Sequence, residues 1–121
     1  MINLAILISG SGSNAKNIMQ YFSSHKNIHV QLLISNNKKS SLIQSLEPSV
    51  NYKIFNKKYF YDGLNVLDEL KKNKISFIVL AGFLLKIPSI IINDFSKKII
   101  NIHPSLLPDF GGKGMYGIYV H

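Results

Sequence analysis

The 121-residue sequence contains no cysteine, no arginine and no tryptophan. Without cysteine the chain can form no disulfide and offers neither a thiol nucleophile nor a thiolate metal ligand, which predicts a cytoplasmic protein. All 14 of its Lys and Arg residues are lysines, so the formal net charge of +8 comes without the forked guanidinium groups that favour base and phosphate recognition. The lysines are also scattered along the chain, and we therefore expect no nucleic-acid partner.

Two further partners, a membrane and a metal ion, have no signal in the sequence. The apolar start of the chain, residues 1–8, lacks the basic region and the length of a signal peptide and is too short to span a bilayer. His25 and His29 fall in a predicted helix-to-strand connection with no carboxylate beside them. We therefore expect neither membrane insertion nor a metal site.

The composition is that of a folded domain. Hydrophobic residues make up 46% of the chain and the mean hydropathy is +0.14, which argues against disorder. We expect a single domain over residues 1–121. This length is below that of a two-halved nucleotide-binding enzyme, so we expect the domain to be incomplete.

Strand and helix patterns alternate along the chain. Apolar or β-branched runs predict strands over 2–8, 28–34, 50–55, 75–80 and 97–102, and helical spacing predicts helices over 15–22, 40–46, 61–73 and 88–95. In the long third helix Leu64, Leu67 and Leu70 are expected to point inward. This alternation predicts an α/β fold with a parallel sheet and right-handed crossovers.

Three polar or glycine-containing segments follow predicted strands: 10–14, 82–84 and 101–103. In parallel α/β sheets ligands bind outside the carboxyl ends of the strands, at the point where the strand order reverses. We therefore expect these three segments to lie at one edge of the sheet.

The first segment, Gly10-Ser11-Gly12-Ser13-Asn14, has the glycines of a tight turn before a helix. Backbone N–H groups at a helix N-terminus form an anion site, which favours a phosphate. The segment matches neither the dinucleotide fingerprint, because Ala15 stands where glycine is needed, nor the P-loop. The alternative is that Ser13 or Asn14 is only a helix cap.

The last segment, Asn101-Ile102-His103-Pro104-Ser105-Leu106-Leu107-Pro108, places an amide and an imidazole two residues apart. In extended backbone such residues leave the same face, so Asn101 and His103 can converge on one small molecule. The alternative is a structural histidine at a strand end. Ser105 lacks the glycine-flanked elbow of hydrolases and Asp109 lies beside two glycines, so both are predicted to be turn or loop residues.

Together, the segments Ile8–Asn14, Val79–Phe83 and Asn101–Pro108 resemble the phosphoribosylglycinamide formyltransferases. The resemblance implies a Rossmann-like three-layer α/β fold with a mostly parallel β-sheet, of which this chain would be the N-terminal portion. It also implies transfer of a formyl group from the cosubstrate 10-formyltetrahydrofolate to glycinamide ribonucleotide, in purine biosynthesis, without a metal. The partners would then be small-molecule substrates.

The resemblance also implies roles for individual residues. The phosphate of the ribonucleotide would be bound by Gly12, Ser13 and Asn14. The folate pocket would be lined by Leu84, Lys86, Ile87 and Asn101. Asn101 and His103 would be two of the catalytic residues, and the third of the family, a downstream Asp, has no counterpart in this sequence.

Two alternatives stay open on the sequence. Methionyl-tRNA formyltransferase and formyltetrahydrofolate deformylase share the motif at Asn101–Pro108, although the segment Gly10–Asn14 favours the glycinamide ribonucleotide enzyme. The second alternative is a truncated, inactive domain that retains only phosphate or folate binding.

Overall fold

The computed structural model describes residues 1–102 and 118–120 of the chain. In chain order the elements are β1 (Ile2–Ile8), α1 (Ser13–Tyr21), β2 (Ile28–Ser35), α2 (Ser41–Gln44), β3 (Tyr52–Ile54), α3 (Lys57–Asp62), α4 (Leu64–Lys72), β4 (Phe77–Ala81), α5 (Ser89–Asp94), β5 (Ile99–Ile102) and β6 (Ile118–Val120). The five predicted strands are all present, each within a few residues of its expected bounds.

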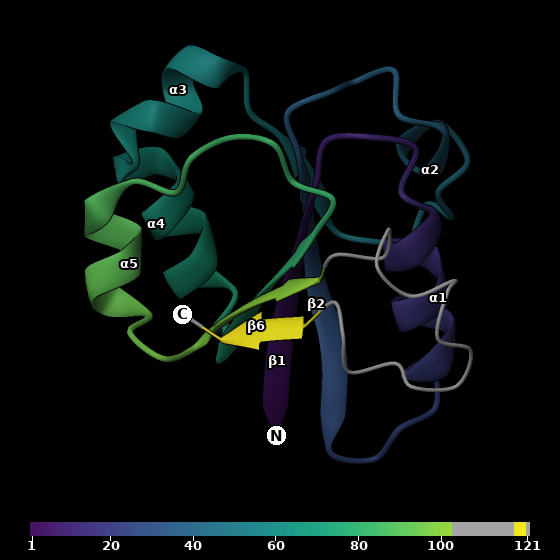
Figure 1. The fold of residues 1–121 in the computed structure, drawn as a ribbon. Helices are drawn as coiled ribbons and strands as arrows, with labels where there is room; N and C mark the ends of the chain where they lie inside the picture. The colour runs from purple at the N-terminus through teal and green to yellow at the C-terminus, as the bar shows by residue number, and fades with distance from the viewer. Residues whose placement is uncertain (103–117, 121) are drawn as a thin grey trace.

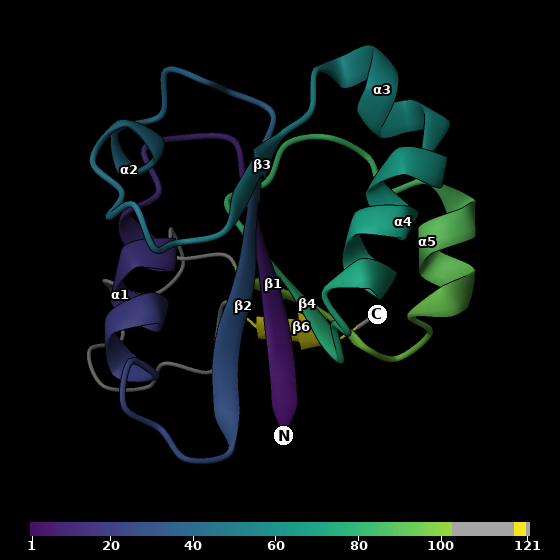
Figure 2. The ribbon, with the colours of Figure 1, turned by 180° about the vertical axis from the view of Figure 1, so that it is seen from behind.

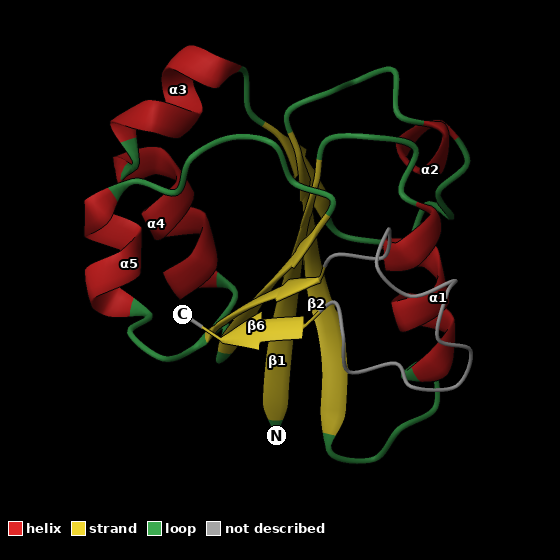
Figure 3. Ribbon diagram, in the orientation of Figure 1, coloured by secondary structure: helices red, strands yellow, loops and turns green. Residues whose placement is uncertain are grey.

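The strands form one sheet in the order β3-β2-β1-β4-β5-β6. The neighbouring pairs among β1 to β5 are parallel, and β6 runs antiparallel to β5. Helices α1 and α2 cover one face of the sheet and α3, α4 and α5 cover the other, as Figures 1 and 3 show. The predicted three-layer, Rossmann-like fold with a mostly parallel sheet is therefore confirmed.

The strand order reverses between β1 and β4. From β1 the chain builds outward through β2 to β3, and it then crosses back to place β4 on the free side of β1. The view from behind in Figure 2 shows β1 and β2 between the two layers of helices. This reversal is the point at which a parallel sheet of this kind opens for a ligand.

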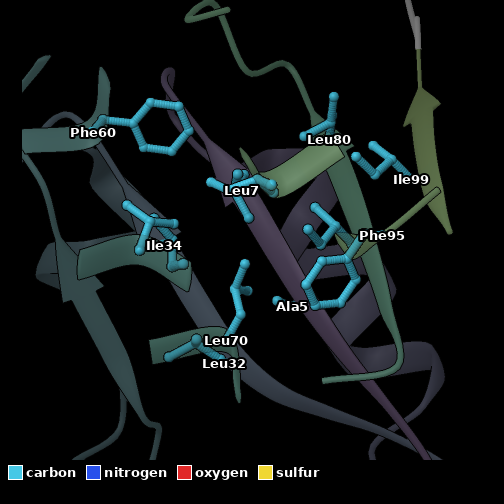
Figure 4. Packing of buried hydrophobic residues seen from close by; sticks show 12 residues of the cluster. Ala5, Leu7, Leu32, Ile34, Phe60, Leu70, Leu80, Phe95 and Ile99 are labelled. Atoms are coloured by element: carbon cyan, nitrogen blue, oxygen red, sulfur yellow. The ribbon is translucent and has the colours of Figure 1, made fainter. Parts of the chain in front are cut away.

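Alternating side chains of the central strands fill two cores, one on each face. Ala5 and Leu7 pack with Leu70 of α4 on one face (Figure 4), whereas Ile6 and Ile8 pack with the α1 side on the other. All five of these side chains are at most 1% exposed. A strand that is buried on both faces reads as an unbroken apolar run, which is why β1 is predictable from sequence alone.

The helix predicted over 61–73 is wrong in its extent, because the chain forms two helices joined at Gly63. Gly63 has φ +80°, a conformation that side chains disfavour, and a Cβ there would lie 2.7 Å from Ile90 Cγ2. The side chain of Asn56 begins the earlier helix by accepting a hydrogen bond from the Tyr59 N–H at 2.9 Å. The break also leaves Leu64 55% exposed, so its predicted inward position is wrong.

Strand β6 was not predicted. Three residues give no readable period, and only pairing with β5, in the register Asn101 to Tyr119, makes them a strand.

Within the described part of the chain, every helix is too short or too polar to cross a membrane.

Replacing Leu70 with alanine should lower the free energy of unfolding by about 2–5 kcal/mol, because the side chain is fully buried against the sheet and its loss leaves a cavity. Leu64→Ala, in the same helix but exposed, should change stability by no more than about 0.5 kcal/mol. Urea denaturation of both variants measures the difference. Equal losses would show that α4 packs through a different face.

Candidate functional site

The carboxyl ends of β1, β4 and β5 lie side by side. Leu7 pairs with Leu80 across β1 and β4, and Leu80 pairs in turn with Asn101 of β5. In Figure 1 the connection after β1 leaves the top of the sheet toward α1, and the connection after β4 leaves it toward α5. The expectation that the three segments meet at one edge is confirmed for residues 10–14, 82–84 and 101–102; His103 lies outside the described residues, as do Ser105 and Asp109.

The turn after β1 depends on Gly12. This residue is buried, has φ +90° and forms the N-cap of α1, and a Cβ added to it would lie 2.6 Å from Leu42 Cβ. Helix α1 starts at Ser13 with no side-chain cap, so the alternative that Ser13 or Asn14 is the cap is wrong. The backbone N–H groups of the first turn have no acceptor within the helix, and groups of this kind bind anions.

The same turn is tied to the start of α2. The carbonyl of Ser11 accepts hydrogen bonds from the Leu42 N–H at 2.9 Å and from Ser40 Oγ at 3.2 Å. Ser40 is itself buried. These two bonds fix the peptide that precedes Gly12, so the turn is held in one conformation before any ligand binds.

The connection after β4, residues 82–87, is anchored on the face of the sheet that α3 covers. It starts at Gly82, with φ +73°, and the Phe83 ring then packs against Phe60 of α3 with 4.9 Å between ring centroids. Leu84 points outward and is 83% exposed. An apolar side chain that is this exposed, beside glycine turns, is available to a ligand.

Lys86 and Ile87 line a pocket of about 330 Å³ that Tyr61, Pro88 and Ser89 complete. The Tyr61 ring also contacts Lys57, whose Nζ lies 5.9 Å from the ring centroid. Lys86 gives the pocket a positive charge, which favours an anionic ligand.

Asn101 is half-buried in β5. Its neighbours Ile100 and Ile102 line an apolar groove of about 310 Å³ beside α1, so alternation directs the Asn101 side chain to the face of α3, α4 and α5. The pocket at Lys86 and Ile87 is completed by Tyr61 of α3 and Ser89 of α5, two helices on that same side of the sheet. The amide is thus on the correct face to reach a ligand seated there.

Ser9, which sequence reasoning left without a role, connects these loops. Its hydroxyl donates to Asn36 Oδ1 at 2.6 Å and accepts from the Leu84 N–H at 2.9 Å, while its carbonyl accepts from Asn37 Nδ2 at 3.2 Å. Ser9 is 7% exposed. A buried serine at a strand end gives no sequence signal by itself, because its partners lie 27 and 75 residues away.

An ion pair between Lys71 and Asp94 lies at the other end of the strands, away from this site. Lys71 Nζ donates a hydrogen bond to Asp94 Oδ2 at 2.8 Å, and this bond together with the negative charge of Asp94 raises the pKa of Lys71. This pair joins the C-terminal ends of α4 and α5, next to the amino ends of the strands. Among the residues that the structure describes, no group of three or more His, Cys, Asp or Glu side chains could hold a metal ion.

With this geometry established, comparison with known proteins decides the family. The family model described as formyl transferase matches residues 2–119. The chain belongs to the formyl transferase family.

Individual relatives agree with this assignment. The chain is 40% identical over 125 residues to the chloroplastic phosphoribosylglycinamide formyltransferase of Arabidopsis thaliana, covering 98% of this chain and 43% of that relative. Among solved structures of formyl transferases, the phosphoribosylglycinamide formyltransferase of Anaplasma phagocytophilum superposes with a TM-score of 0.74 at 34% identity, over 93% of this chain and 54% of that one. Glycinamide ribonucleotide transformylase 1 of Geobacillus kaustophilus gives 0.77 at 33% identity, over 93% and 63%. The chain thus spans about half the length of the relatives it matches.

Replacing Gly12 with alanine should lower the free energy of unfolding by about 1–3 kcal/mol, because the new Cβ meets Leu42 and φ +90° strains any side chain. It should also weaken phosphate binding by displacing the first turn of α1. Thermal unfolding and titration with inorganic phosphate measure the two effects.

Gly10→Ala is the matched control in the same turn, since a Cβ there meets no atom within 4 Å and φ is not positive. If both variants behave alike, the special role of Gly12 is refuted.

Proposed function

We propose that this chain provides the phosphate and folate sites of a phosphoribosylglycinamide formyltransferase, and that it acts in purine biosynthesis. The observation that supports it best is the meeting of the Gly12 turn, the 82–87 connection and Asn101 at the point of strand reversal. The family match and the printed names of the relatives support the same reading. The substrates are 10-formyltetrahydrofolate and glycinamide ribonucleotide, and the proposed location is the cytoplasm, although the Arabidopsis relative is chloroplastic.

In the proposed reaction the amine of the ribonucleotide attacks the formyl carbon. A new C–N bond forms, the bond from the formyl carbon to the folate nitrogen breaks, and one proton passes from the attacking nitrogen to the departing folate nitrogen. Negative charge develops on the formyl oxygen as the tetrahedral intermediate forms. Catalysis therefore requires a hydrogen-bond donor for that oxygen and a group that moves the proton.

Asn101 and His103 can supply these two functions. The Asn101 amide is a fixed donor to the oxygen, a role in which one donor contributes about 3 kcal/mol of transition-state stabilisation. His103 follows two residues later, and an imidazole with an ordinary pKa near 6.5 can donate to the same oxygen or carry the proton. A carboxylate next to His103 would orient the ring and favour its charged form.

The binding roles follow from the two loops. Gly12, Ser13 and Asn14 would bind the phosphate through the first turn of α1. Leu84 and Ile87 would supply apolar contacts to the folate, whose carboxylates suit the charge of Lys86 at the pocket.

Asn101→Ala should reduce the turnover number for formyl transfer by about 10²–10³-fold with little change in the affinity for glycinamide ribonucleotide, because the donor acts on the transition state. Asn93→Ala, an exposed asparagine on α5, is the matched control and should leave both quantities unchanged. Steady-state assays with 10-formyltetrahydrofolate give the turnover number, and calorimetry gives the affinity for glycinamide ribonucleotide.

Full turnover in the Asn101→Ala variant would refute the assigned role. If the unaltered chain binds both ligands without turnover, it is a binding domain whose catalysis requires more than residues 1–121. Release of formate without the ribonucleotide would instead identify a deformylase.

A further inference from the structure

Ser9 occupies the junction of three strand-end loops. It follows β1 directly, its hydroxyl bonds to Asn36 in the loop after β2, and the same hydroxyl accepts the N–H of Leu84 in the loop after β4. With 7% exposure, the hydroxyl has little competing water. The Ser9 hydroxyl therefore joins two distant residues: it donates to one that is 27 positions away and accepts from one that is 75 positions away.

The 82–87 connection depends on this hydroxyl at its midpoint. The Leu84 side chain makes no use of the core, since it is 83% exposed, so the backbone N–H is the point at which this residue is held. On either side, Phe83 and Leu85 pack against the core. Gly82, which precedes these anchors, has a positive φ, and a Cβ there would meet no atom within 4 Å.

We propose that Ser9 is a positioning residue that sets the folate-binding connection against the phosphate turn. This rests on the proposed function, and it adds a residue that touches neither substrate. By holding the Leu84 amide, the Ser9 hydroxyl fixes the distance from the pocket at Lys86 and Ile87 to the turn at Gly12. Loss of the hydroxyl leaves the Leu84 N–H without its partner and releases the connection, whereas the Gly12 turn keeps its own bonds from Leu42 and Ser40.

Ser35 offers a matched comparison. It is also a buried serine at the end of a neighbouring strand, with 0% exposure, and its hydroxyl likewise makes two hydrogen bonds. Both go to the backbone of Asn37, two residues away, so they stabilise a local turn and do not touch the 82–87 connection. Ser35→Ala thus removes an equivalent hydroxyl without the proposed role.

The test compares the affinity for two ligands in the full chain. In Ser9→Ala the dissociation constant for 5-formyltetrahydrofolate, a stable reduced folate, should rise about tenfold, which corresponds to about 1.4 kcal/mol. The dissociation constant for glycinamide ribonucleotide should change by less than about twofold. Hydrogen exchange should show the Leu84 amide at least about tenfold faster while the amides of residues 12–14 keep their rates.

Two further variants separate positioning from general stability. Asn36→Ala removes the acceptor of the Ser9 hydroxyl but leaves its bond to Leu84, so its effect on folate affinity should be smaller than that of Ser9→Ala. Ser9→Thr keeps a hydroxyl and should restore the slow exchange of Leu84.

The proposal is overturned if Ser35→Ala weakens folate binding as much as Ser9→Ala, or if Ser9→Ala weakens both ligands equally. It is also overturned if the Leu84 amide exchanges at the same rate in both serine variants. Failure of the proposed function has a different signature: the unaltered chain then binds neither ligand, and both proposals fall together.

Discussion

The reversal of strand order at β1 and β4 is the constraint on which the candidate site depends. Because both strands are central and parallel, their carboxyl ends are adjacent while their connections leave in opposite directions, toward α1 and toward α5. At such a reversal a parallel sheet opens for a ligand. The fold thereby creates the ligand position, and the loop residues determine which ligand it fits.

Polar groups at this edge hold the loops in place. Ser9, Ser11 and Ser40 use their hydroxyl or carbonyl groups to fix neighbouring loops. Every buried side-chain nitrogen or oxygen among the described residues has a hydrogen-bond partner. Binding groups held in this way lose little conformational entropy when a ligand arrives, which is the physical basis of a preformed site.

Much of this arrangement could be predicted from the sequence. The buried run of β1 and the glycine turn after it carry strong local signals, so the α/β fold and the position of Gly12 follow directly. The break at Gly63 could not be predicted in the same way, because an isolated glycine is compatible with a continuous helix until Ile90 packs against it. The role of Ser9 depends on contacts between distant segments, and β6 depends on pairing with β5. Local patterns contain neither kind of information.

Backbone amide spectra of the isotope-labelled chain, recorded during titration with each substrate, test the central claim most directly. The account predicts that glycinamide ribonucleotide shifts the amides of residues 10–14 and that 5-formyltetrahydrofolate shifts those of residues 82–87, with Asn101 responding to both ligands. Shifts confined to other parts of the described chain, such as the apolar groove beside α1 or the β3 edge, would contradict it.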